Sequence, residues 1–332
     1  MAVYTAIDDP EAYFQTVLYT GDGNNSRTIT LPGDTDMQPD MIWIKERSST
    51  SSHYLTSIGM GIGTRLEPDG TSTESTEGLS AVTSDGFTIG TSTNQVNQNT
   101  ITHVAWCWKE SATAGFDIVT YTGNGSARTI SHSLSAVPHL MILKSRTYAE
   151  NWQIYNHKMA SDPETDYLEF RNTAIADSAG TWNDTAPTSS VFSVGDRDAT
   201  NKNTYTYINY LWTEKQGFSK FGSYTGNGNA DGTFIHLSFR PAWIMFKHTS
   251  DTQSWYIYDV KRRTYNVMNT FVKADTSQAE STSGVNIFDV CSNGIKIRGD
   301  GSVINSDGVT YVYMAFADAP FVNSKGVPCN AK

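Results

Sequence analysis

The stretch that decides the fold is YTGDG at residues 19–23, because it returns twice along the chain. It reads YTGNG at residues 121–125 and again at 224–228, so the copies start 102 and 103 residues apart. Asn-Gly and Asp-Gly pairs tolerate a positive φ and favour tight turns between strands. A turn that recurs at this interval predicts three copies of one long unit.

Three further markers follow each turn in the same order. Pro39, Pro138 and Pro241 each precede an apolar run, and a lysine lies six residues after each proline. A short strand pattern comes next, typified by GFTIG at 86–90, and an aromatic strand pattern such as THVAW at 102–106 closes the unit. Four markers in constant order and spacing are strong evidence for an internal repeat.

The markers divide the chain into three units with short ends. The predicted parts are an N-terminal attachment segment, three β-sandwich repeats and a C-terminal tail, at residues 1–12, 13–112, 113–217, 218–321 and 322–332. A period near 100 residues is too long for a solenoid repeat, and each unit is long enough to own a core. The linkers are short, so we expect the units to pack against each other.

Within a unit the pattern favours strands. The apolar runs after the prolines are continuous, which is typical of strands buried on both faces. Six to eight short strands in such a unit predict an all-β fold of antiparallel sandwich or jelly-roll type. One helical turn is expected near the start, because Asp9 can cap it and Pro10 suits the first helical position.

Composition excludes several classes of protein. The 332 residues carry a net charge of −10, and the only basic run is Lys261 to Arg263, which argues against nucleic acid as a partner. Three widely separated cysteines (Cys107, Cys291 and Cys329) suggest neither a disulfide framework nor a zinc site. The apolar runs are too short for a membrane span. The start of the chain does not resemble a signal peptide, so we expect folding in a reducing cytosol.

No catalytic residue, metal ligand or cofactor is predicted. The chain lacks nucleophile, phosphate-loop and zinc motifs, and His103 lies in a strand marker where it is most simply a packed ring. The Gly-rich turns are read as structural, although residues 226–232 are the best calcium candidate among them. Ligand-binding residues are not assigned. Recognition is expected where the units differ, in the polar stretches 61–80, 159–184 and 261–284.

Four aromatic residues allow two interpretations. Trp152, Tyr155, Trp255 and Tyr258 could stack on sugar rings, since aromatic faces suit the apolar face of a pyranose. Their recurrence in two units is explained more simply by a shared core, and we favour that reading.

With the repeat assembled, the chain resembles a known group of proteins. The resemblance lies in the repeated turn, in the opening residues 4–14, in residues 182–192 and 217–228, and in the ending 313–321. These segments resemble repeat-domain structural proteins of tailed bacteriophages, notably of marine and freshwater bacteria. The resemblance covers nearly the whole chain, and it implies a tail or tail-fibre-like virion protein. It brings no catalytic residues with it.

The resemblance and the residues together favour a non-enzymatic virion structural protein. We expect a tail fibre or tail adhesion component that contacts the host surface. The alternatives are a capsid decoration or head-fibre protein and a polysaccharide-degrading tail enzyme. The expected partners are other virion proteins docked through residues 1–12, sister copies in a homo-oligomer such as a trimer, and a host surface glycan or protein. No nucleic acid or membrane insertion is expected, and the expected location is the virion, assembled in the host cytoplasm.

Overall fold

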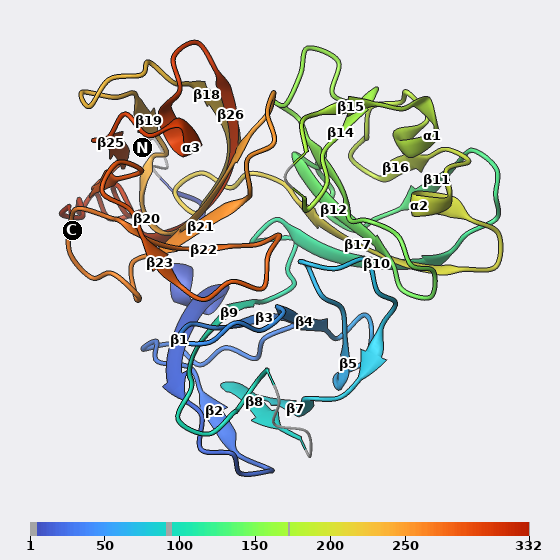
Figure 1. Cartoon of the computed structure of the whole chain (residues 1–332), viewed down its shortest axis with the longest axis horizontal. Coiled ribbons are helices and arrows are strands. Elements are labelled where there is room, and N and C mark those ends of the chain that lie inside the picture. The colour runs from blue at the N-terminus through green and yellow to red at the C-terminus, as the bar shows by residue number, and fades with distance from the viewer. Residues whose placement is uncertain (1–4, 91–94, 172, 332) are drawn as a thin grey trace.

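The computed structural model describes residues 5–90, 95–171 and 173–331 and is built almost entirely of antiparallel sheets. The chain forms three lobes around a common centre, each with larger sheets inside and smaller sheets outside (Figure 1). The helices of the described residues are single turns, namely η1 (Pro10–Ala12), α1 (Ala179–Trp182), α2 (Asp198–Asn201) and α3 (Ser302–Asn305). The all-β prediction is therefore confirmed.

One large inner sheet belongs to each lobe. In the first lobe its order is β1 (Phe14–Thr20), β9 (Thr102–Trp108), β3 (Met41–Glu46) and β4 (Tyr54–Ser57). In the second it is β10 (Phe116–Thr122), β17 (Thr206–Trp212), β12 (Leu140–Ser145) and β13 (Gln153–Asn156). In the third it is β18 (Ser219–Thr225), β26 (Thr310–Pro320), β20 (Phe239–His248), β21 (Tyr256–Asp259), β22 (Thr270–Lys273) and β23 (Ser281–Thr282).

Smaller sheets lie at the periphery. They are β2 (Thr28–Thr30), β8 (Gly86–Ile89) and β7 (Leu79–Thr83) in the first lobe, β11 (Arg128–Ser131) and β16 (Val191–Val194) in the second, and β19 (Phe234–His236), β25 (Gly294–Ile297) and β24 (Phe288–Cys291) in the third. Two more ribbons pair β5 (Thr64–Arg65) with β6 (Ser75–Thr76) and β14 (Asp166–Tyr167) with β15 (Ala176–Asp177).

The middle strands of the inner sheets are buried on both faces. Every residue of β3 and β12 is buried, as the continuous apolar runs predict. In β3, Trp43 belongs to the large central core, whereas Ile42 and Ile44 belong to a second cluster that includes Phe87 of the outer sheet. Successive side chains of a strand point to opposite faces, so this alternation places each inner sheet between the centre and an outer sheet.

The centre is one aromatic core shared by the three lobes. The ring of Phe170 lies 5.7 Å from Trp43, 5.7 Å from Trp152 and 5.4 Å from Trp255, and these tryptophans come from the first, second and third lobes. Trp106 and Trp243 extend the contact between the first and third lobes, at 6.2 Å. Residues of all three lobes are therefore in direct contact. The large cluster runs through all three lobes, and the first lobe has a second cluster of its own.

Hydrogen bonds from ring nitrogens join the lobes in a closed cycle. Trp152 Nε1 donates to the Glu67 carbonyl at 2.9 Å, and Trp255 Nε1 donates to the Glu169 carbonyl at 2.7 Å. His53 Nε2 lies 2.9 Å from the Lys273 carbonyl, while its Nδ1 accepts from a tryptophan N–H, so Nε2 carries the proton and donates. The second lobe thus bonds to the first, the third to the second, and the first to the third.

The recurrent Gly-rich turns are held by buried asparagines. Asn201 is fully buried, and its Nδ2 donates to Asn124 Oδ1 and to the carbonyls of Ser126 and Gly195. Two other buried asparagines hold the other two turns. The Asn97 amide donates to oxygens of Asp22 and Asn24, and the Asn305 amide donates to oxygens of Asn227, Asn229 and Gly299. At Gly123 a Cβ would lie 2.1 Å from the Lys202 carbonyl, so this turn position has no room for a side chain.

The start of the chain differs in part from expectation. The helical turn is confirmed as η1, with Asp9 accepting from the Glu11 N–H. Part of the N-terminal segment packs into the fold: the Thr5 hydroxyl and the Ala6 N–H both donate to the Gln216 carbonyl, and the buried Ile7 side chain joins the central core. Residues 1–4 lie outside the described ranges.

The end of the chain returns to its start. In the tail, Ser324 N–H donates to Asp8 Oδ1 at 2.7 Å. None of the helices in the described ranges is long and apolar enough to span a bilayer.

Candidate binding pocket between the second and third lobes

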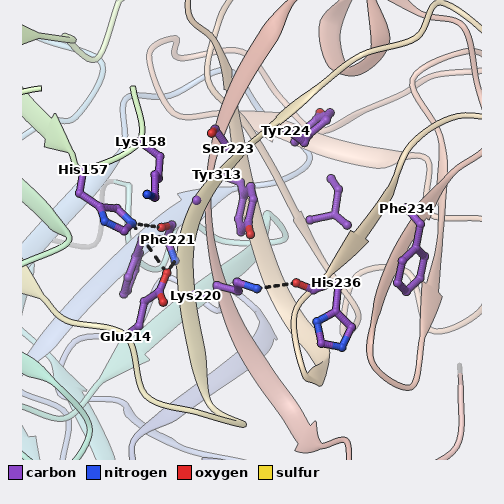
Figure 2. A pocket seen from close by; sticks show the side chains of 12 residues that line it. His157, Lys158, Glu214, Lys220, Phe221, Ser223, Tyr224, Phe234, His236 and Tyr313 are labelled. Carbon is purple, nitrogen blue, oxygen red and sulfur yellow. Dashed lines mark hydrogen bonds and ion pairs between the residues drawn. The ribbon is translucent and has the colours of Figure 1, made fainter. Parts of the chain in front are cut away.

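A pocket of about 360 Å³ opens between β18 of the third lobe and the end of β13 in the second. Figure 2 shows His157 and Lys158 on one side, Phe234 and His236 on the other, and Tyr313 between them. Its volume lies within the range of ordinary small-ligand sites, roughly 300–1,000 Å³. The lining combines charged, hydroxyl and aromatic groups, so the pocket is polar.

The floor of the pocket comes from one exceptional pair of neighbouring residues. Gly222 on β18 pairs with Tyr313 on β26. The corresponding pairs in the other inner sheets are Val17 with Ala105 and Val119 with Asn209. A glycine in place of a valine leaves room above the sheet, and the Tyr313 ring fills part of it, since a Cβ on Gly222 would lie 2.6 Å from the Tyr313 hydroxyl.

The pocket runs along the free edge of β18. Two side chains of the second lobe bind both backbone groups of Phe221: Glu214 Oε1 accepts its N–H at 3.1 Å, and His157 Nε2 donates to its carbonyl at 2.6 Å. Backbone groups alternate between the two sides of an antiparallel strand, so the N–H and C=O of Ser223 point to the same outer side. Neither has a partner among the described residues, and Ser223 lines the pocket.

Both histidines at this junction are neutral. Burial lowers the pKa of His157 to about 4, and the hydrogen bond to Phe221 offsets this only in part. Burial also lowers the pKa of His139, whose ring lies 4.3 Å from that of His157 and whose Nδ1 accepts the Glu214 N–H at 2.9 Å. The positive charges of the pocket therefore belong to Lys158 and Lys220.

The geometry suits binding better than acid–base chemistry. His157 Nε2 is 3.8 Å from Glu214 Oε1, but both atoms are engaged by the Phe221 backbone. A general acid or base needs a tuned proton within reach of a bound substrate. Here the imidazole N–H and the carboxylate oxygen are committed to holding the edge of β18, so the groups left to meet a ligand are the lysines, the Tyr313 hydroxyl and the Ser223 backbone.

A second cavity, of about 510 Å³, lies at the centre where the three lobes meet. Its lining includes Asp69, Phe170, Arg171 and Asp275. Burial raises the pKa of both aspartates, although each accepts a backbone N–H, from His53 and from Trp255 respectively. These carboxylates therefore hold the backbone just before β4 and β21, next to the central core.

Each inner sheet contains one buried lysine, and the three lysines lie at equivalent positions of their strands. Lys45, Lys144 and Lys247 are fully buried, and each ammonium donates to two backbone carbonyls. Burial lowers the pKa of each to about 8. For Lys45 and Lys144 one acceptor belongs to another lobe, Ser277 and Thr71 respectively, so these lysines also join the lobes.

Each of the three stretches expected to carry recognition has a residue that contacts another lobe. Stretch 61–80 contains Glu74, which pairs with Arg146 of the second lobe at 2.6 Å. Stretch 261–284 contains Glu280, which pairs with Arg47 of the first lobe at 3.0 Å. Stretch 159–184 supplies Phe170 to the centre. All three therefore serve lobe contacts, and their role in recognition stays a prediction.

Several residues singled out in the sequence are buried. The core reading of the four aromatic residues Trp152, Tyr155, Trp255 and Tyr258 is confirmed, because all are buried. His103 is a packed ring, stacked on Tyr19 at 4.9 Å. The basic run at 261–263 is not a patch, because Arg262 is buried and paired with Asp259.

Two oxygens of turn 226–232 are used in hydrogen bonds within the protein. The Asn227 and Asn229 oxygens accept from the Asn305 amide. The thiols of Cys107, Cys291 and Cys329 are free. The described residues contain no group of three or more His, Cys, Asp or Glu that could hold a metal ion.

Sequence reasoning missed two features that matter here. The asparagines Asn97, Asn201 and Asn305 recur at steps of 104 residues, close to the period of the turns, and could have been found by extending the repeat comparison. The Gly222–Tyr313 pair could not be found this way, because it becomes visible only once the strand register is known.

The lobes and the pocket together define a class: an all-β, three-lobed protein with one shared aromatic core and a polar pocket at a lobe junction. The chain belongs to the DUF7483 family, described as a domain of unknown function, whose model matches residues 9–320. The matched range includes residues of all three lobes. A comparison with curated proteins finds no match.

Proposed function

We propose that this protein is a non-enzymatic structural component of a bacteriophage virion, displayed on the tail as a fibre or adhesion component that contacts the host surface. The observation that carries the binding role is the pocket of Figure 2, where His157 and Glu214 are held by backbone while two lysines and Tyr313 stay available. The virion role rests on the resemblance of the sequence to repeat-domain phage proteins.

We further infer that the chain consists of three tandem β-sandwich repeats related by approximate threefold symmetry. The equivalent hydroxyls of Tyr19, Tyr121 and Tyr224 support this, because they donate to carbonyls at equivalent places, 2.6, 2.5 and 2.7 Å away. The shared strand order of the inner sheets supports it too. A superposition of residues 13–112, 113–217 and 218–321 in an experimental structure would test this inference.

Docking to other virion proteins is assigned to the N-terminal segment, with Tyr4 as an anchor that lies outside the described residues. Because Thr5 and Ile7 are buried, the fair test deletes residues 1–4 alone. The shortened chain should fold but fail to enter particles. Incorporation at the normal level would contradict this role.

The overall proposal is tested with purified particles and purified protein. Staining of virion proteins should give a few to tens of copies per particle, and the protein should bind host cells and compete with phage adsorption. Hundreds of copies without competition would favour a capsid decoration or head-fibre protein. Release of reducing ends from host polysaccharide would favour a polysaccharide-degrading tail enzyme.

A further inference from the structure

We propose that the pocket between the second and third lobes binds an acidic sugar residue, a hexuronic acid within an anionic polysaccharide. The binding chemistry follows from the pocket itself. The source of the sugar, the host surface, rests on the proposed function.

The charge of the pocket selects an anion. Lys158 and Lys220 bring two ammonium groups to the lining, and neither has an ion-pair partner among the described residues. The one carboxylate of the lining, Glu214, already accepts the Phe221 N–H. Lys220 Nζ donates to the His236 carbonyl at 2.7 Å, which fixes its position and leaves two further N–H donors. A carboxylate between the two lysines would meet charge-assisted donors from both lobes.

The neutral groups of the pocket suit hydroxyls. The Tyr313 side chain is mostly buried and lines the pocket, and its hydroxyl makes no hydrogen bond within the described ranges. The outward N–H and C=O of Ser223 stand beside it as one donor and one acceptor. A ligand that supplies hydroxyls would give hydrogen-bond partners to these groups, which the protein leaves open.

The rim supplies an apolar surface. The Phe234 side chain lines the pocket and is 44% exposed, on the strand β19 where Ile235 points inward. Aromatic rings pack well against the C–H face of a sugar ring. An anion without an apolar face, such as phosphate, would leave this side chain unused.

A β-strand peptide fits the free edge poorly. Of the outward backbone groups of β18, those of Phe221 are taken by Glu214 and His157, and the Thr225 carbonyl accepts the Thr233 hydroxyl at 2.7 Å. Only Ser223 is left open between them. Strand addition draws its affinity from several consecutive backbone pairs, and here a single residue is free.

The experiment is calorimetric titration of the full chain with galacturonate and mannuronate hexamers, each compared with its methyl ester, which keeps the shape but removes the charge. We expect at least one acid hexamer to bind and its ester not to bind. Lys158→Gln and Lys220→Gln should each weaken binding roughly tenfold. Lys261→Gln, an equal change of charge at an exposed lysine outside the pocket, should leave binding unchanged.

A second variant tests the cavity rather than the charge. Gly222→Val together with Tyr313→Ala recreates the pair that β1 and β9 use, Val17 with Ala105, and should abolish binding in a folded chain. The proposal is overturned if neither acid hexamer binds, if the esters bind equally, if an acidic peptide binds more tightly, or if the double variant still binds.

These outcomes are distinct from failure of the adhesion role. A chain that binds a hexamer but does not compete with phage adsorption keeps the pocket and loses the proposed function. If the double variant competes with adsorption as well as the original chain does, the adhesion role stands and this pocket is not the site that carries it.

Discussion

Tyr313 occupies the space that Gly222 leaves on the neighbouring strand, with its hydroxyl 2.6 Å from the position that a Gly222 Cβ would take. In the first lobe the larger residue of the equivalent pair, Val17, lies on the edge strand and the smaller, Ala105, on its neighbour. In the third lobe the order is reversed, with Gly222 on the edge strand and Tyr313 on its neighbour. The exchange keeps the sheet packed while it opens a pocket at the strand edge.

The exchange predicts compensation between the two positions. Gly222→Val alone should lower the free energy of unfolding by about 2–3 kcal/mol, because the new side chain meets the Tyr313 ring. Gly222→Val with Tyr313→Ala should recover most of that loss. Urea unfolding of the two single variants and the double variant measures the coupling, and strict additivity would contradict it.

The turn asparagines should be among the most sensitive polar positions. Asn201→Ala removes donors to three oxygens in a fully buried site, and we expect a loss of about 3 kcal/mol of unfolding free energy. Asn203→Ala, two residues away and exposed, should change stability by less than about 0.5 kcal/mol. Thermal and urea unfolding of both variants tests this, and equal losses would show that the amide does not hold the turn.

A matched pair of variants measures how much a hydrogen bond from a ring nitrogen to another lobe contributes to stability. Trp152→Phe and Trp212→Phe both shorten a buried tryptophan, but only the Trp152 N–H has a partner, the Glu67 carbonyl. We expect Trp152→Phe to cost about 1–2 kcal/mol more, since it leaves that carbonyl unpaired. The two unfolding curves give the difference directly. A cost no greater than that of Trp212→Phe would mean that the cycle adds no stability.

The buried lysines predict a dependence of stability on alkaline pH. Their pKa is about 8 in the folded chain and near 10.5 when unfolded, so the unfolded state binds more protons between these values. The free energy of unfolding should therefore gain on the order of 1 kcal/mol per lysine between pH 8 and 9.5. Burial raises the pKa of Cys107, which acts in the opposite direction above pH 9.

The lysine contribution is separated by comparing slopes rather than absolute stabilities. Lys144→Met should flatten the rise of unfolding free energy with pH by about a third, whatever it does to stability at pH 7. Urea unfolding at several pH values measures this. A slope unchanged by the substitution would show that Lys144 is not the group that titrates.

The sequence predicts local features well because they arise from neighbouring residues. The strands over Met41–Glu46 and Leu140–Ser145, the turn at Asp9 and Pro10, and the core role of Trp152 and Trp255 follow from periodicity and recurrence. The core shared by the three lobes could not be predicted from the sequence. Its contacts join residues such as His53 and Lys273, which are 220 residues apart, and no local pattern around either residue indicates that they meet.

The pocket could not be predicted from the sequence either, for a different reason. Recognition was expected in the long variable stretches, where polar residues and length differences are obvious. Residues of these stretches contact other lobes, as Glu280 does with Arg47, and their role in recognition stays a prediction. The open groups of the pocket arise from single residue differences within the strands. A glycine in a strand is informative only when its partner across the sheet is known.

The closed cycle of lobes has a consequence for how the chain is made. The bond that completes it joins His53 to Lys273, so the first lobe emerges from the ribosome long before its partner exists. Until the third lobe arrives, the central face of the first sheet, with Trp43 and Trp106, faces water as an apolar surface. The growing chain is therefore exposed to aggregation and to chaperones until its last strand is complete, and a cut after the second lobe leaves a surface that other chains can occupy.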